Sequence, residues 1–185
     1  MVTIGVTGHR KLNEVEKILT GVDEALHEVK EAFRGEDLTI ISPLAEGADR
    51  LVVWRAMENN AVHLVVPLPL EVSDYVLDFD SISSKAEFVT LLEEAAQVIE
   101  LPAKETREAS YQAVGLYILN HSDILIAIWD GQPARGPGGT GQIVAEARKQ
   151  KMPLAWVFAS NQNQDTSSQT TPDKSPGDVT LENFP

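Results

Sequence analysis

The sequence predicts an α/β protein with a Rossmann-like three-layer fold and a mostly parallel central sheet. Short β-branched or continuously apolar runs alternate with helical segments, and glycine-bearing turns follow several of the predicted strands. Continuous apolar runs are typical of parallel strands that are buried on both faces. The 185 residues, 43% of them hydrophobic, suffice for one domain with a full core.

Strands and helices are expected to alternate along the chain. The segments expected to form strands are 2–7, 38–42, 62–66, 98–101, 123–129 and 153–158. The segments expected to form helices are 13–33, 46–59, 84–95, 111–119 and 142–150. Two of these helices begin with the spacing of a capping box, Asn13 with Glu16 and Ser84 with Glu87.

The composition changes near the end of the chain. Residues 1–159 make up the predicted Rossmann-like domain, whereas residues 160–185 are rich in Asn, Gln, Ser, Thr, Asp and Pro. Such a segment buries too little apolar surface to offset the entropy that is lost on ordering it. We therefore expect a flexible polar tail, in which Val179, Leu181 and Phe184 dock weakly at most.

The formal net charge is −13, and the acidic residues are scattered along the chain. An acidic surface repels the phosphate backbone of nucleic acids and anionic lipid headgroups, so neither nucleic acid nor membrane is an expected partner. A small anion is compatible with this charge, because backbone N–H groups and one or two arginines can hold it in a cleft. The sequence leaves a homodimer open.

The chain has no cysteine, which excludes disulfides, thiolate-bound metals and a cysteine nucleophile. Its four histidines are scattered, so no metal site is expected, and no motif indicates a cofactor. The segment MVTIGVTGHR leads directly into a predicted strand, with no signal-peptide pattern and no apolar run of membrane-spanning length. We therefore expect a cytoplasmic protein.

The first of three candidate ligand turns is TGHR, residues 7–10, at the end of the first predicted strand. In parallel α/β sheets, ligands bind beyond the carboxyl ends of the strands. Gly8 would allow a close approach of the backbone, and Arg10 would offer a forked donor for phosphate or carboxylate. His9 shares the turn and is a further candidate contact. The alternative is an ordinary tight turn.

The second turn is AEGADR, residues 45–50, after the second predicted strand. Gly47 and Ala48 are small enough for close approach at a helix start, where unpaired N–H groups favour an anion. Asp49 and Arg50 are candidate ligand contacts. Helix capping by Asp49 and an ion pair between the two side chains are the simpler alternatives.

The third turn is GPGGTG, residues 136–141, between the most apolar strand and a helix. A run of backbone N–H groups ahead of a helix predicts a phosphate cradle, although a flexible lid is the alternative. The turn is neither a P-loop nor the dinucleotide fingerprint. The candidate ligand-binding residues of this region are Asp130, Gly138, Gly139, Thr140, Gly141 and Gln142.

Asp130 would accept a hydrogen bond from a ribose at the end of the preceding strand. Trp129 beside it is either a stacking surface for the ligand or part of the core.

Three segments together resemble the SLOG superfamily: VTGHR, SPLAEGADRL, and SDILIAIWDG followed by GPGGTGQIVAEAR. This superfamily includes LOG-type phosphoribohydrolases, DprA-type DNA-processing proteins and other nucleotide-binding proteins, and the resemblance covers roughly residues 1–158. It implies a nucleotide or nucleotide-derived ligand over the glycine-rich turn. It also implies that strand 123–129 lies beside the first strand, which would bring TGHR and GPGGTG together.

The same resemblance supplies an enzyme as the alternative to a binding protein. LOG-type enzymes carry PGGxGTxxE, whose glutamate serves the cleavage of an N-glycosidic bond. Aligned on this motif, Ala145 takes the place of the glutamate, and Glu146 lies one residue later, turned by about 100° on a helix. Glu146 is the candidate catalytic residue of such a nucleoside-monophosphate phosphoribohydrolase.

Our leading interpretation is a protein that binds a nucleotide or nucleotide derivative, with ligand sensing as its role. The phosphoribohydrolase is the rival, and a scaffold whose cleft binds nothing is the third alternative.

Overall fold

The computed structural model describes residues 1–59, 61–134, 136–160 and 174–185. Within these residues one seven-stranded sheet has the order β4-β3-β2-β1-β5-β6-β7. Strands β1 to β6 run parallel, and β7 pairs antiparallel with β6. The strands are β1 (Val2–Gly8), β2 (Leu38–Ile41), β3 (Val62–Leu68), β4 (Gln97–Glu100), β5 (Ile124–Trp129), β6 (Leu154–Phe158) and β7 (Val179–Glu182). The predicted α/β class and mostly parallel sheet are confirmed.

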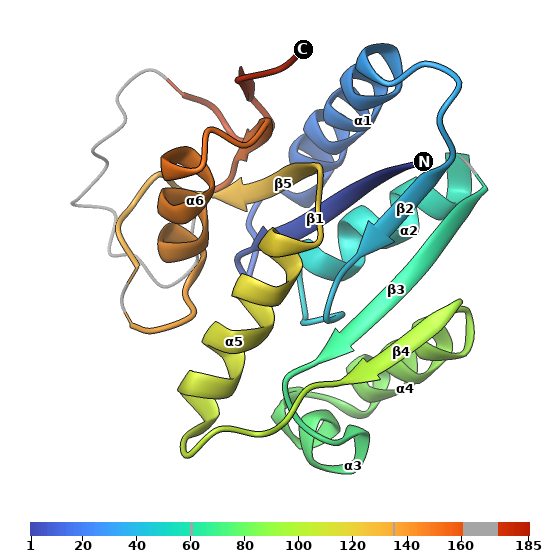
Figure 1. Ribbon diagram of the computed structural model, residues 1–185, viewed down its shortest axis with the longest axis vertical. Helices are drawn as coiled ribbons and strands as arrows, with labels where there is room; N and C mark the ends of the chain where they lie inside the picture. Colours follow the sequence, from blue (N-terminus) through green and yellow to red (C-terminus); the bar gives the residue numbers. More distant parts are fainter. Residues whose placement is uncertain (60, 135, 161–173) are drawn as a thin grey trace.

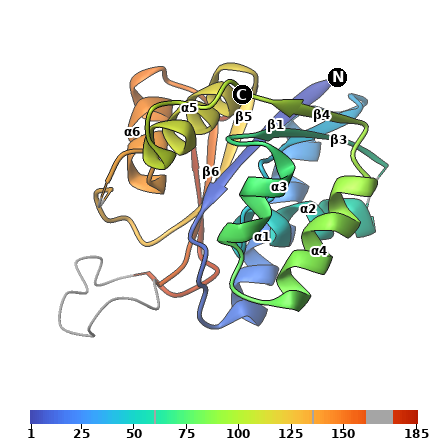
Figure 2. The same ribbon diagram turned by 90° about the horizontal axis from the view of Figure 1, so that it is seen from below.

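Helices cover both faces of the sheet, which gives the three layers of a Rossmann-like fold (Figure 1). In Figure 2, α1, α2 and α4 lie on one side of the sheet and α5 and α6 on the other. A short helix, α3, continues into the 3-10 helix η1 ahead of α4. The helices are α1 (Val15–Ala32), α2 (Ala48–Asn59), α3 (Val72–Tyr75), η1 (Val76–Asp78), α4 (Ile82–Glu93), α5 (Arg107–Asn120) and α6 (Thr140–Lys149).

The apolar pattern of the sequence explains this layering. Every residue of β5 is buried, as expected of a central parallel strand with helices on both faces. On α1, Ile18, Val22, Leu26 and Val29 are buried at helical spacing and face the sheet. The hydrophobic effect therefore fixes which face of each element turns inward.

The order of the strands places a switch point between β1 and β5. From β1 the chain moves outward to β2, β3 and β4, and it then returns to place β5 on the other side of β1. Gly5 of β1 is in register with Ile41 on one side and Leu125 on the other. Because the connections on the two sides leave on opposite faces, a crevice forms beyond the carboxyl ends of β1 and β5. The expected position of β5 beside β1 is confirmed.

The end of the chain differs from the expected flexible tail. Residues 161–173 lie outside the described residues, but Val179–Glu182 form β7, which pairs with β6. Val179 and Phe184 pack against the main core, and Arg148 of α6 forms an ion pair with Glu182. Composition predicted disorder because the segment is polar overall. The free edge of β6 supplies the backbone partners that its composition does not reveal.

Both expected capping boxes are wrong. The residue that precedes α1 is Glu14, in a left-handed conformation and without a side-chain cap. Helix α4 is capped by Ser81, whose hydroxyl accepts a hydrogen bond from the amide of Ser84 at 3.0 Å. Ser84 and Glu87 are thus inside the helix, where their side chains serve a different contact.

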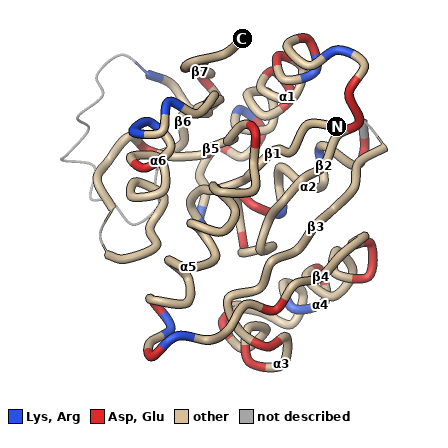
Figure 3. Tube along the Cα trace, in the orientation of Figure 1, with Lys and Arg blue, Asp and Glu red and all other residues tan. Residues whose placement is uncertain are grey.

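Charged residues are distributed over most elements. In Figure 3, acidic positions recur along α1, α3 and α4, and basic positions on α6 and ahead of α5. None of the helices in the described part of the chain has both the length and the apolar character needed to cross a membrane.

Candidate functional site

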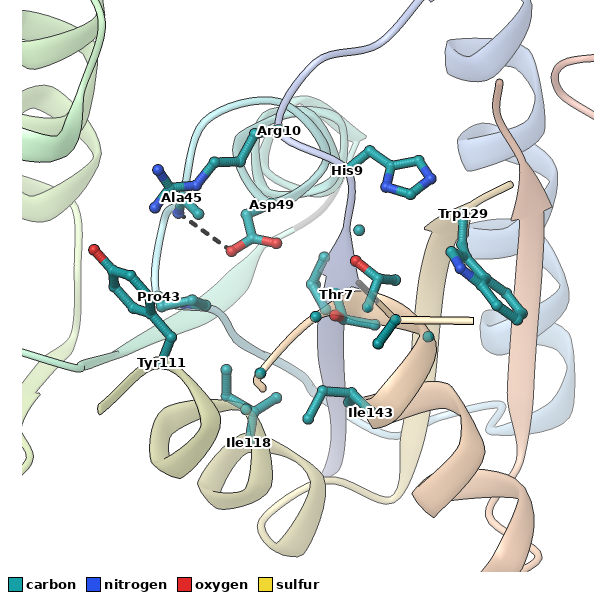
Figure 4. Close-up of a pocket in the computed structure, with 18 of the residues that line it drawn as sticks. Thr7, His9, Arg10, Pro43, Ala45, Asp49, Tyr111, Ile118, Trp129 and Ile143 are labelled. Carbon is teal, nitrogen blue, oxygen red and sulfur yellow. Dashed lines mark hydrogen bonds between the residues drawn. The ribbon is translucent and has the colours of Figure 1, made fainter. Parts of the chain in front are cut away.

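A cavity of about 450 Å³ opens at the switch point, beyond the carboxyl ends of β1 and β5. Its volume lies in the range of about 300–1,000 Å³ that is usual for small-molecule sites. The turn after β1, the segment after β2, helix α5 and the turn before α6 all contribute to its wall (Figure 4). The predicted ligand-binding residues that line it are Gly8, His9, Arg10, Asp49, Asp130, Gly138, Gly139, Thr140 and Gly141.

The first turn of α6 faces this cavity. Gly139 precedes the helix and accepts the amide of Gln142 at 2.9 Å. Among the described residues, the backbone amides of Thr140 and Gly141 donate no hydrogen bond. Unpaired amides at the positive end of a helix favour an anion.

The glycines of this turn are required by its geometry. Gly138 has φ 76°, and a Cβ at this position would lie 2.7 Å from the backbone nitrogen of Gln112. Its amide donates to Oε1 of Gln142 at 2.8 Å. Gln142 therefore holds the turn in shape and does not line the cavity, contrary to its predicted ligand contact.

The turn after β1 packs closely on α2. A Cβ on Gly8 would lie 2.4 Å from Cβ of Ala48 and 2.7 Å from the carbonyl oxygen of Ile128. The amide of Ala48 donates to the carbonyl of His9 at 3.0 Å. Gly8 therefore allows the strand and the helix to meet at the floor of the site.

Gly47 and Ala48 support the site without lining it. Gly47 has φ 78°, and a Cβ there would lie 2.3 Å from the carbonyl oxygen of Arg10. A close contact is present at these two residues, as their small size indicates. The group in contact is the backbone of residues 9 and 10, whereas the sequence predicted a ligand. Gly47 and Ala48 position the segment that carries the first ligand turn.

Asp49 is the most perturbed acid of the cavity wall. It is 5% exposed, and its Oδ2 accepts the amide of Ala45 at 3.2 Å. Burial raises the pKa of Asp49 to about 7, against the lowering effect of the hydrogen bonds from Ala45 and Ser42 and the charges of Arg10 and Arg50. Asp49 accepts a hydrogen bond from Ala45, which precedes α2 in the chain. Asp49 therefore does not cap the amides of the first turn of α2, which was one alternative for its role.

Arg50 faces away from the cavity, so its predicted ligand contact is wrong. The residue is 2% exposed, and its Nε donates to the carbonyl of Leu44 at 2.9 Å. Nη1 lies 2.9 Å from Oε2 of Glu87 and also donates to Ser84. The guanidinium lies 4.4 Å from the centre of the Phe79 ring. Arg50 thus joins α2 to α4.

Arg10 lies at the opening of the cavity. Its guanidinium is 5.6 Å from the centre of the Tyr111 ring. The Tyr111 hydroxyl donates to Asp78, which also forms an ion pair with Arg107 at 3.1 Å. This network fixes α5 against η1 beside the cavity, and it leaves the Arg10 guanidinium at the rim, where a ligand could reach it.

His9 and Asp130 form the opposite corner. Nε2 of His9 lies 3.2 Å from Oδ1 of Asp130 and 3.1 Å from its backbone nitrogen. Burial alone would raise the pKa of Asp130, but the hydrogen bonds from His9 and from the Gln132 amide hold it below its ordinary value. Asp130 is therefore an ionised acceptor at the end of β5.

Trp129 is part of the core and also lines the cavity, so its expected stacking on a ligand stays a prediction. It is 5% exposed and packs against Trp156 with 5.5 Å between the ring centres, yet it also lines the cavity. Its Nε1 donates to the carbonyl of Gln132 at 2.9 Å, which fixes the ring.

Glu146 does not line the cavity. Its carboxylate lies 3.3 Å from Nζ of Lys149, and hydrogen bonds from Gln150 and Lys149 lower its pKa. Ala145, one residue earlier, is exposed and is also outside the cavity wall. In the described residues, the carboxyl groups of the cavity wall are Asp49 and Asp130.

The sequence missed Tyr75 and Gln132, and it treated Tyr111 only as an inward residue of a helix. All three line the cavity. Tyr111 had a detectable signal, because it stands on the same face of its helix as the apolar residues but carries a polar group. Tyr75 had none, since it lies in a four-residue helix.

No family model matches the chain, and no curated protein is significantly similar to it. In the described residues, no three His, Asp or Glu side chains group as they would to hold a metal ion.

Proposed function

We propose that the chain binds a nucleotide or nucleotide derivative in the cavity between β1 and β5. One observation carries this proposal most directly: the turn after β1 and the glycine-rich turn before α6 line the same cavity. A switch-point crevice with a helix N-terminus behind it is the usual position for a phosphorylated ligand in this class of fold. The resemblance to the SLOG superfamily, proposed from three motifs, agrees with this location.

The wall suggests how such a ligand would lie. Its phosphate would accept hydrogen bonds from the amides of Thr140 and Gly141, which donate none to the described residues. Asp130, kept ionised by its hydrogen bonds, would accept from a ribose hydroxyl. Apolar side chains from α5 and α6, such as Ile118 and Ile143, would cover the sugar or base.

Binding without turnover is the form of the proposal that the positions of the acids support. In the rival function, N-glycosidic hydrolysis of the LOG type, a glutamate of the helix after the glycine-rich turn must face the substrate. Glu146 instead pairs with Lys149 outside the cavity wall. We therefore propose a nucleotide-binding protein, with sensing as its role, over a phosphoribohydrolase.

A calorimetric titration tests the proposal directly. A thermal-shift screen with AMP, GMP, CMP, UMP, the corresponding diphosphates and inorganic phosphate would select ligands, since saturating ligand stabilises the folded state by mass action. The best of them should then bind saturably, at one site per chain. If no nucleotide binds in either measurement, the cavity is not a nucleotide site.

A further inference from the structure

We infer that Asp49 binds the nucleotide in its protonated form, donating a hydrogen bond from its carboxylic acid to an acceptor atom of the ligand, so that binding takes up a proton. This inference rests on the proposed function. Under this inference, Asp49 favours ligands that present a hydrogen-bond acceptor to it, and the affinity for the nucleotide depends on pH.

The position of Asp49 comes first in support. Its carboxyl group points into the space between Arg10, Thr7 and Tyr111, at the end of the cavity away from Trp129 (Figure 4). The residue is 5% exposed and lines the cavity, so any ligand that fills this end contacts it.

The neighbours of Asp49 do not neutralise it by pairing. In the described residues no ion pair includes Asp49. The nearest cation of its own helix, Arg50, directs Nε to Leu44 and Nη1 to Ser84 and Glu87, while its buried Nη2 has no hydrogen-bond partner among the described residues. Arg10 after β1 lies over the Tyr111 ring.

The other groups that face Asp49 are neutral. Its hydrogen-bond donors are the amide of Ala45 and the hydroxyl of Ser42, which follow β2. From α3, Tyr75 faces it, and burial raises the pKa of this phenol far above neutrality. A buried carboxylate without a paired cation is costly, which is why the pKa of Asp49 rises to about 7.

A bound nucleotide would favour the protonated acid further. The ligand displaces water from around Asp49, and its phosphate brings negative charge into the same cavity, so both effects disfavour the carboxylate. The neutral acid can still accept from Ala45 with one oxygen, and its O–H is then free to donate to a ligand oxygen or ring nitrogen. A ligand that presented a donor to Asp49 would instead favour the carboxylate and release a proton.

The test compares the parent protein with Asp49→Asn as pH rises. The asparagine has the shape of the protonated acid and keeps an N–H donor, but it does not titrate. The probe is whichever of AMP, GMP, CMP and UMP binds best, and its own ionisation affects both proteins equally. Between about pH 6 and about pH 8.5, the affinity of the parent should fall up to about 30-fold relative to the variant, the factor that a pKa of about 7 allows.

Glu146→Gln is the matched control, because it neutralises a carboxylate that lies outside the cavity wall. It should keep the pH dependence of the parent. A second measurement does not depend on the folding of any variant: calorimetry of the parent in buffers of different ionisation enthalpy. Near pH 8, where the phosphate of the probe is already ionised, it should report net proton uptake.

The outcomes separate the inference from the proposed function. If the affinities of the parent and of Asp49→Asn change in parallel, within about threefold over this pH range, the inference is wrong while nucleotide binding stands. Proton release by the parent near pH 8 overturns it equally. If none of the four monophosphates binds the parent at any pH, the proposed function fails and the inference fails with it.

Discussion

Replacing Asp49 with asparagine should stabilise the protein, and the gain should depend on pH in a defined way. The pKa of Asp49 is about 7 in the folded chain, whereas its ordinary value is 3.8. The folded state therefore holds this proton more tightly than the unfolded state. The stabilisation that comes from this protonation of Asp49 is fully present below about pH 4 and is lost as pH rises towards about 7. Asparagine carries no such pH dependence.

The two pKa values set the size of the effect. Each tenfold difference in proton affinity corresponds to about 1.4 kcal/mol, so the difference between 3.8 and about 7 gives an upper bound of about 4 kcal/mol. The discount for solvent screening is small, since Asp49 is 5% exposed. Near pH 4 the two proteins should differ little, because the protonated acid and the amide have similar hydrogen-bonding capacity.

Urea unfolding of both proteins at a series of pH values measures this difference. The free energy of unfolding of Asp49→Asn minus that of the parent should rise between about pH 4 and about pH 7 and then stay level. Asp130→Asn should show no such rise between about pH 4 and about pH 7. Hydrogen bonds from His9 and Gln132 hold the pKa of Asp130 below 3.8, so its ionised form contributes to stability above about pH 4 and the contribution is lost only at lower pH. A difference for Asp49→Asn that is the same at low and neutral pH would refute the assignment of a buried, unpaired acid.

Three further changes test the cavity and the end of the chain. Gly138→Ala should abolish binding of the best nucleotide in the screen, because the φ of Gly138 is 76° and an added Cβ would meet backbone atoms. Gly136→Ala should bind the nucleotide normally, since no atom lies within 4 Å of its added Cβ. Equal affinities of the two variants would show that the glycine-rich turn is not part of the binding site. Glu146→Gln should leave nucleotide affinity unchanged, and chromatography should detect no base release above background from parent or variant, since the residue lies outside the cavity wall. A chain that ends at residue 160 should lose about 2 kcal/mol or more in urea unfolding, because β7 covers the edge of β6 and Val179 packs on the core; unchanged stability would mean that this strand contributes nothing.

The fold could be predicted because short stretches of the sequence are enough to identify most of its strands and helices. Every residue of β5 is apolar, and β1 and β2 have similar runs, so strand character is visible in short windows. The alternation with helices then implies parallel strands, and a parallel sheet implies ligands at the carboxyl ends. Strand β7 lacked such a signal, since its four residues lie in a polar segment and pair only because β6 presents a free edge.

The sequence predicted where the backbone of the candidate site makes close contacts, but it predicted less well which side chains face the cavity. Glycines at turns mark close approach wherever it occurs, so the sequence located Gly8, Gly47 and Gly138 correctly as points of contact. It could not tell whether the group that approaches is a ligand or the chain itself. At Gly47 the approaching group is the backbone of Arg10, a residue that is distant in sequence.

Asp49 and Arg50 show most clearly why adjacent side chains cannot be assigned from their motif. One step along α2 turns a side chain by about 100°, so the two residues must face different surroundings. What surrounds Arg50 is decided by α4, whose Ser84 and Glu87 stand 34 and 37 residues further along the chain. Because Nε and Nη1 of Arg50 bind Leu44 and α4, the neighbouring Asp49 forms no ion pair with it among the described residues, although the charge of Arg50 still lowers the pKa of Asp49. The contact between Arg50 and α4 on one side of α2 thus leaves Asp49 as a titrating group on the other side. This relation depends on residues that are distant in sequence, so it is visible only in the folded structure.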